Sequence, residues 1–97
     1  MSKPKYDYYG YIKMRIQKYP ALKKENTIMA LMQWNAIEHE LASVREENSD
    51  KYKAIQMVLI KRTHTINGAA YVLNYSYATV KLWISEFVKA VARRSGF

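Results

Sequence analysis

The chain has 97 residues, carries 16 Lys and Arg against 8 Asp and Glu for a formal net charge of +8, and contains no cysteine. This length suits one small domain and is too short for a typical catalytic domain with a deep cleft, while the missing thiols exclude disulfides and thiolate metal sites. No apolar run is long enough to span a membrane and the first residues lack the apolar core of a signal peptide, so we expect a cytoplasmic protein with no membrane partner.

The charge is distributed unevenly along the chain. Residues 1–24 carry seven cations against one acid (+6), residues 25–50 carry one cation against six acids (−5), and residues 51–97 carry eight cations against one acid (+7). The last block has the sign required for binding nucleic-acid phosphates, whereas the middle block would repel them. The alternative is a basic surface that binds no partner, which is common in soluble proteins.

Helical periodicity predicts a small all-α fold. We divide the chain into two helical parts, and the first covers residues 1–49. A basic helix is expected over residues 6–18, ended by the Tyr19-Pro20 pair because the residue before a proline avoids helical dihedrals. Pro20 then begins a long helix over residues 20–47, for which a break near Asn26-Thr27 is left open. The inward side chains expected from these two helices are Tyr9, Ile12, Ile16, Tyr19, Ile28, Leu31, Met32, Trp34, Ile37 and Leu41.

Several tyrosines gather near the start of the chain, among lysines. They are Tyr6, Tyr8, Tyr9 and Tyr11. Aromatic rings interleaved with cations can stack the bases of a single strand, but tyrosines of this kind also pack a helix end with their hydroxyls in water. Packing is the favoured interpretation.

The second part covers residues 50–97, and we expect it to form one compact domain with the first. Residues 46–50, Glu-Glu-Asn-Ser-Asp, are expected to be a linker in which Ser49 or Asp50 caps the next helix. That helix is expected to end at Lys61-Arg62, where cations complement the negative end of the helix dipole. Its inward side chains are expected to be Tyr52, Ile55, Val58 and Leu59.

Residues 65–85 predict a helix-turn-helix motif, in which two short helices cross at a tight turn. Thr65 is the expected cap of the first helix, and Asn74 is the residue best suited to a left-handed turn. Ser76 is the expected cap of the second helix, which begins at Tyr77 and continues to about Arg94. Small residues are expected at the crossing, namely Gly68, Ala69 and Ala70. The apolar faces are expected to be Ile66, Ala70 and Leu73 on the first helix and Val80, Trp83, Ile84, Phe87, Val88 and Val91 on the second.

The opposite face of the second helix is polar and would meet the major groove of a DNA duplex. In such motifs the first residues of the second helix approach base edges, while hydroxyls, lysines and the helix N-terminus hold phosphates. An ordinary pair of core helices is the alternative. The residues that we assign to DNA contact are Ser76, Tyr77, Ala78, Thr79, Lys81, Ser85, Thr65, Lys61 and Arg62.

Catalysis and metal binding have little support in the sequence. His39 and His64 are the only histidines, and neither belongs to a pattern of metal ligands or of a nucleophile with its base. The three glycines are too scattered to form a phosphate loop. We therefore expect a protein that is not an enzyme and that needs no metal or other cofactor.

The stretch from Asp50-Lys51-Tyr52-Lys53-Ala54 to Leu73-Asn74-Tyr75-Ser76-Tyr77-Ala78-Thr79-Val80 resembles the C-terminal part of phage late transcriptional regulators of the RinA and ArpU type. Those ends are similar to region 4 of sigma-70-type factors. The long last helix with Trp83, Phe87 and Val91 belongs to the same resemblance, which covers about half of the chain. Asn74 and Tyr77 replace the glycine or serine common around the turn, and the first helix lacks an acidic residue after its cap.

The resemblance implies a regulator that binds promoter DNA of phage or prophage genes and activates transcription, with RNA polymerase as a further contact. The sequence itself supports double-stranded DNA as the partner and leaves open whether one copy or a homodimer binds. A DNA-packaging subunit like a small terminase is an alternative. Another is a helical adaptor that holds a partner helix on the stripe formed by Met29, Met32, Trp34 and Ile37.

Overall fold

The computed structural model describes residues 7–96, which form helices and no strand, so the predicted all-α fold is confirmed for this range. The first half contains α1 (Asp7–Gln17), the 3-10 helix η1 (Tyr19–Glu25) and α2 (Ile28–Glu47). The second half contains α3 (Ser49–Ile55), the π-helical turn η2 (Gln56–Ile60), α4 (Ile66–Leu73) and α5 (Tyr77–Arg94). No helix among these residues is long and apolar enough to cross a membrane.

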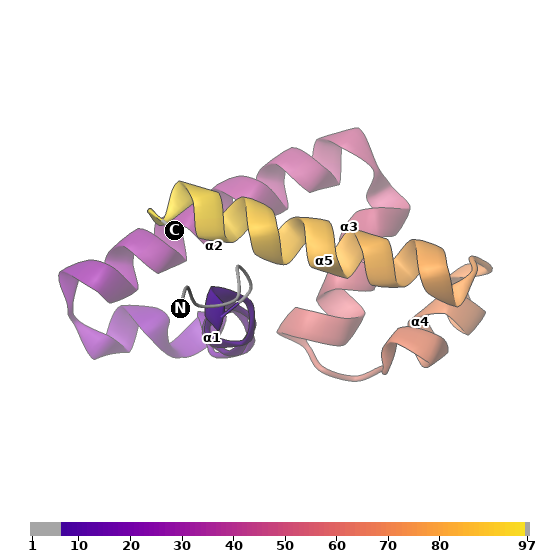
Figure 1. The fold of residues 1–97 in the computed structure, drawn as a ribbon, viewed down its shortest axis with the longest axis horizontal. Helices are drawn as coiled ribbons and strands as arrows, with labels where there is room; N and C mark the ends of the chain where they lie inside the picture. The colour runs from indigo at the N-terminus through magenta and orange to yellow at the C-terminus, as the bar shows by residue number, and fades with distance from the viewer. Residues whose placement is uncertain (1–6, 97) are drawn as a thin grey trace, which may run out of the picture.

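The last helix, α5, is the centre of the fold. It runs along the length of the molecule and packs against α1, α2, α3 and α4 (Figure 1). One hydrophobic core therefore contains side chains from both halves of the chain. Its largest fully buried members are Phe87, Ile12, Ile16, Leu22, Ile37, Ile55, Leu59 and Ile84.

The first helix packs as predicted. Ile12 and Ile16 are fully buried, four residues apart on one face of α1. Tyr8 and Tyr9 are half-buried against the core, which supports packing rather than a base-stacking surface for these two rings. The expected start of this helix at residue 6 and the ring of Tyr6 lie outside the described residues.

The long helix expected over residues 20–47 is broken at the position that the sequence left open. Asn26 adopts a left-handed backbone with φ 52° after η1, and the Thr27 hydroxyl accepts a hydrogen bond from Ala30 N at 3.1 Å to begin α2. The rings of Tyr19 and Trp34 stack with centroids 6.3 Å apart, which holds η1 against α2. The break lets the chain fold back on itself.

The inward face of α2 is the largest error among the sequence predictions. Ile37 and Leu41 are buried as expected and Trp34 is half-buried, but Ile28, Leu31 and Met32 are exposed. Small and polar side chains replace them inside, where η1 and α5 pack closely against α2. The buried residues of α2 are Ala30, Gln33, Ala36, Ile37, Leu41 and Val44.

Arg15 explains how Gln33, only 1% exposed, can be buried at this interface. The Arg15 Nε donates to Gln33 Oε1 at 2.7 Å, and the Gln33 amide donates to the Tyr11 hydroxyl at 3.2 Å. The two terminal nitrogens of Arg15 bind the Glu25 carboxylate at 2.9 and 2.7 Å. The Arg15 guanidinium thus joins α1, η1 and α2. Its bidentate pair with the Glu25 carboxylate is of the charge-assisted type, which is stronger than a hydrogen bond between neutral groups.

This ion pair predicts a pH dependence of stability. The hydrogen bond from Arg15 holds the pKa of the Glu25 carboxyl below its usual range. A carboxyl whose pKa is lowered by folding stabilises the protein above its unfolded pKa and loses that contribution as the pH falls through its folded pKa. We expect Glu25→Gln to lower the melting temperature at pH 7 and the difference from the wild type to shrink toward pH 2.5. Glu47→Gln is the matched control. If Glu25→Gln lowered the melting temperature by the same amount at pH 7 and at pH 2.5, the prediction would be contradicted.

The connection between α2 and α3 contradicts the expected linker. A single residue, Asn48, separates the two helices, and its side chain accepts hydrogen bonds from Asp50 N at 3.2 Å and Lys51 N at 3.1 Å. Asn48 is therefore the cap, instead of Ser49 or Asp50. Polar composition alone could not distinguish a linker from a tight corner whose polar side chains cap a helix.

The helix expected to end at Lys61-Arg62 ends earlier, at Ile60, after a π-helical turn. Ile55 and Leu59 are buried as predicted, whereas Tyr52 and Val58 are half-buried. A hydrogen bond from Lys61 N to Gln56 O at 2.8 Å closes the turn, and Arg62 then takes a left-handed backbone with φ 56°. The chain changes direction here toward α4.

Candidate nucleic-acid interface

The helix α4 begins as predicted. The Thr65 hydroxyl accepts a hydrogen bond from Gly68 N at 3.0 Å. Ala69 and Ala70 are buried, and these small side chains allow the close approach of α4 and α5. The expectation that Gly68 lies at the crossing of α4 and α5 is wrong. A Cβ at this position would first meet Thr65 Oγ1 at 3.4 Å and the His64 side chain at 3.6 Å, and both of these residues precede α4 instead of belonging to α5.

Three residues, 74–76, join α4 to α5 (Figure 1). Asn74 has the predicted left-handed backbone with φ 64°, and its N–H donates to the carbonyls of Ala70 and Tyr71. The Ser76 hydroxyl accepts from Thr79 N at 3.1 Å and shares a further hydrogen bond with the Thr79 hydroxyl at 2.9 Å. Both ends of the connection are therefore fixed by local hydrogen bonds.

Tyr75 anchors the middle of this turn. Its ring meets Trp83 edge to face with centroids 4.7 Å apart, and its hydroxyl donates to Asp50 Oδ2 at 2.7 Å. This hydrogen bond to the carboxylate raises the pKa of Tyr75. The turn is thus tied to α5 through the Tyr75 ring and to α3 through the Tyr75 hydroxyl.

The inward face of α5 agrees with the sequence prediction. Trp83 is half-buried, and the other members of the predicted stripe have exposed fractions of 1% or less. These are Val80, Ile84, Phe87, Val88 and Val91. Since the inward face is fixed, the orientation of the outward face follows from the helical period.

The outward face begins with Tyr77, Ala78 and Lys81, all of which are exposed at the N-terminal end of α5. The Lys81 ammonium lies 6.0 Å from the centroid of the Tyr77 ring, within the range of a weak cation–π contact. Thr79 and Ser85 are half-buried. The structure therefore gathers five of the predicted contact residues, Ser76, Tyr77, Ala78, Thr79 and Lys81, on the first two turns of one helix.

A basic stripe continues along α5 beyond these turns. Lys81 and Ser85 line a hollow of about 720 Å³ together with Lys89 and with Tyr9 of α1. The sequence prediction missed Lys89 and Tyr9 as members of this surface. The spacing of four residues from Lys81 to Ser85 and again to Lys89 could have identified the lysine, whereas Tyr9 belongs here only because α1 packs on α5.

The remaining predicted contact residues lie before or at the start of α4. Lys61 and Arg62 are exposed after η2, and Thr65 is exposed at the cap of α4. Lys61 lines a second hollow of about 490 Å³ with Lys53 of α3 and Val72 of α4, between α3, η2 and α4. The structure does not bring these cations onto the stripe of α5, so they form a separate basic edge.

Acidic groups are rare on this half of the molecule. Glu86 is the single acid among residues 51–97, and Lys51 binds its carboxylate at 3.0 Å. Asp50, the nearest acid before this segment in the sequence, accepts the Tyr75 hydroxyl. The outward face of α5 therefore presents hydroxyls and ammonium groups to a ligand, a combination that suits phosphate oxygens.

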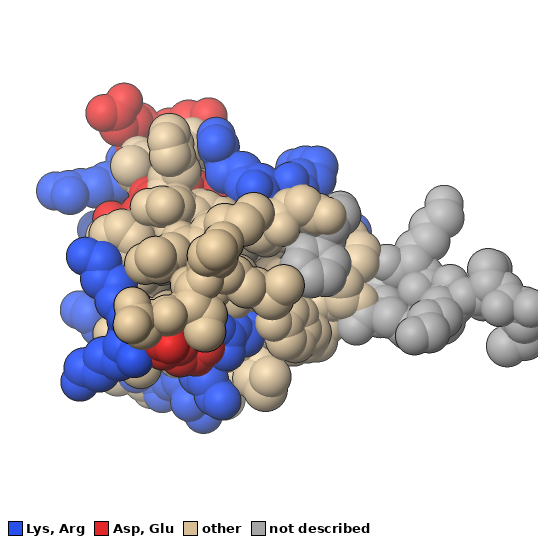
Figure 2. Space-filling model, turned by 90° about the vertical axis from the view of Figure 1, so that its left-hand side faces the viewer, with Lys and Arg blue, Asp and Glu red and all other residues tan. Residues whose placement is uncertain are grey.

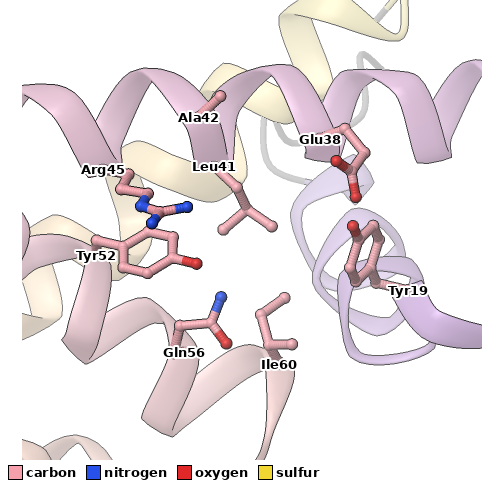
Figure 3. A pocket seen from close by; sticks show the side chains of 8 residues that line it. All are labelled: Tyr19, Glu38, Leu41, Ala42, Arg45, Tyr52, Gln56 and Ile60. Atoms are coloured by element: carbon pink, nitrogen blue, oxygen red, sulfur yellow. The ribbon is translucent and has the colours of Figure 1, made fainter.

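A further hollow of about 260 Å³ lies among η1, α2, α3 and η2 (Figure 3). Glu38 and Tyr19 form one wall, and the Arg45 guanidinium stands 5.9 Å from the Tyr52 ring at the other wall. Among the described residues, no cluster of three or more His, Asp or Glu side chains could hold a metal ion. We assign no chemistry to this hollow, which holds one carboxylate and neither of the two histidines.

Comparisons with protein-family models, curated proteins and solved structures found no match to this chain. Geometry and charge are therefore the observations that support a nucleic-acid interface on this protein.

Proposed function

We propose that this protein binds double-stranded DNA, with α4 and α5 acting as a helix-turn-helix motif and the first turns of α5 entering the major groove. The observation that carries the proposal is the exposed face formed by Tyr77, Ala78 and Lys81 directly after a turn held by local hydrogen bonds. Recognition by such motifs needs a rigid helix whose N-terminal side chains reach base edges. The anchored turn and the buried opposite face of α5 supply that rigidity.

Phosphate binding is supported by the same end of the helix. The first N–H groups of a helix and its positive dipole favour an anion, and Ser76 and Thr79 add hydroxyls there. Lys81 and Lys89 are separated by about 12 Å along the axis at 1.5 Å per residue, so the two cations can contact different parts of a groove wall. The basic edge with Lys61 and Arg62 offers a second set of phosphate contacts.

The resemblance to phage late transcriptional regulators extends the proposal to gene regulation. On this proposal the protein binds promoter DNA, activates transcription and contacts RNA polymerase, as one copy or as a homodimer. Selection of bound sequences from random duplexes tests the specificity that a regulator needs, and a palindromic site would indicate a homodimer. Recovery of unrelated sequences would contradict a specific regulator.

We expect Lys81→Ala to weaken DNA binding by roughly 1 to 3 kcal/mol at one sequence if the ammonium contacts a base edge. An equal loss on all sequences would instead assign Lys81 to a phosphate and reduce the salt dependence of binding. Fluorescence anisotropy with labelled duplexes at two salt concentrations measures both effects. Lys24→Ala, an exposed lysine of η1, is the matched control. Failure of the wild type to bind any duplex at low salt would overturn the DNA proposal.

A further inference from the structure

The first turns of α2 carry large apolar side chains on the surface. Ile28 is 79% exposed, Met29 56%, Leu31 43% and Met32 49%. Figure 2 looks at this end of the molecule, where uncharged side chains cover most of the centre of the face and Lys and Arg lie along much of its margin, with Asp and Glu at its upper edge and below its centre. A contiguous apolar surface surrounded by polar groups is typical of an interaction site.

The helix α1 adds a second row to this surface. Tyr11 and Met14, three residues apart on α1, are exposed by 36% and 43%, and the Tyr11 hydroxyl lies 3.7 Å from the Met29 sulfur. The two helices therefore present their apolar side chains next to each other. We define the α1–α2 apolar patch as Tyr11, Met14, Ile28, Met29, Leu31 and Met32.

The shape of the α1–α2 apolar patch suits a helical partner. On α2, Ile28, Leu31 and Met32 follow the spacing of three and four residues that makes one helix face. Beyond Met32 the surface continues into a hollow of about 230 Å³ between α2 and the Arg94 side chain at the end of α5. Methionine adapts to different partners because its side chain is unbranched and flexible. An amphipathic helix placed on these rows would cover them with its own apolar face.

The charge around the patch determines the kind of partner. Residues 11–36 contain five cations and one acid, Glu25, whose carboxylate binds Arg15. Arg93 and Arg94 add positive charge from the end of α5, and Glu40 binds Arg94. A second copy of this chain would bring the same positive margin against the first. Like charges across an interface are unfavourable, whereas an acidic margin would be complementary.

We propose that the α1–α2 apolar patch binds an amphipathic helix of a partner protein whose apolar face is flanked by Asp and Glu. The proposal is independent of DNA binding, because α2 begins at the end of the molecule opposite to α4 and the start of α5 (Figure 1). Both surfaces can be occupied together. A protein with these two surfaces would join a duplex to an acidic helical partner.

The test uses three fluorescent synthetic helices of equal length. The first has leucines on one face with glutamates beside them, the second has the same leucines with lysines beside them, and the third has the composition of the first in shuffled order. We expect anisotropy to show binding of the first helix and at least tenfold weaker binding of the other two. Ile28→Ser with Met32→Ser should weaken binding of the first helix at least tenfold and leave DNA affinity unchanged.

The matched control is Val72→Ser with Leu82→Ser, two exposed apolar residues of α4 and α5, which should leave helix binding unchanged. Thermal melts of both double variants establish that they fold, and the comparison of the three helices needs no variant. Equal binding of the shuffled or the lysine-flanked helix would overturn the proposal, as would absence of binding. Sedimentation that shows a wild-type dimer and a monomeric Ile28→Ser, Met32→Ser variant would also overturn it, in favour of a second copy on the patch.

Discussion

Val80→Asp is expected to unfold the protein at neutral pH, because the aspartate would place an unpaired charge in the core at the start of α5. Val80 is fully buried. An uncompensated buried charge costs roughly 3 to 5 kcal/mol, and small domains are often stable by only about 5 kcal/mol or slightly more. The favourable interaction of an acid with the helix N-terminus contributes about 0.3 to 1 kcal/mol and cannot offset this cost. Circular dichroism and urea titration measure the effect.

The neighbouring substitution Lys81→Asp separates the fold from the interface. Lys81 is exposed, so the same new side chain would be solvated there and should leave the melting temperature nearly unchanged. DNA affinity should nevertheless fall, because a negative charge would replace a positive one on the outward face of α5. A folded Val80→Asp protein, or a Lys81→Asp protein that unfolds, would contradict the assignment of the two faces.

The part of the sequence that predicted structure best is the segment from Thr65 to Val91. Its signals are local, since a cap or a left-handed residue forms its hydrogen bonds within about four residues along the chain. Thr65, Asn74 and Ser76 have the predicted roles for that reason. The stripe of α5 was also clear, because one long helix with apolar residues at a regular spacing has one possible inward face.

The sequence predicted α2 poorly, because its apolar residues are not its buried residues. The inward position of Gln33 depends on Arg15, which lies 18 residues away in the sequence, and no local pattern indicates that contact. Large exposed side chains such as Ile28 and Leu31 then produced an apparent stripe with the wrong orientation. The π-helical turn η2 was missed for a similar reason, since no residue type marks it.

The sequence predicts those residues of the candidate interface that lie on one helix, α5. It does not predict the residue that joins the interface only because another helix packs against α5. Tyr77, Ala78 and Lys81 follow from the period of α5 alone. Lys89 was detectable from the same period, but Tyr9 joins the surface only through the contact between α1 and α5. The stripe of Met29, Met32, Trp34 and Ile37, the alternative site for a partner helix, is not exposed as a whole. Met29 and Met32 are exposed, whereas Trp34 is half-buried and Ile37 is buried in the core.

Phe87→Ala is expected to destabilise the fold by roughly 3 to 5 kcal/mol, the range typical of removing a large ring from a core. Phe87 is 1% exposed and lies near the middle of α5, the helix against which α1, α2, α3 and α4 all pack. The cavity would therefore weaken several helix contacts together. Urea unfolding followed by circular dichroism should give a lower midpoint with an unchanged slope, as expected when stability alone changes.

Leu82→Ala is the matched control for Phe87→Ala, because Leu82 lies on the same helix and is 57% exposed. Substitutions at exposed positions usually change stability by no more than about 0.5 kcal/mol. A comparable loss in the two variants would mean that the outward face of α5 is covered in solution, for example by a second copy. In that case the Leu82→Ala loss should depend on protein concentration, since only an assembly is stabilised by mass action. A loss confined to Phe87→Ala would instead support an α5 whose outward face is open to a duplex.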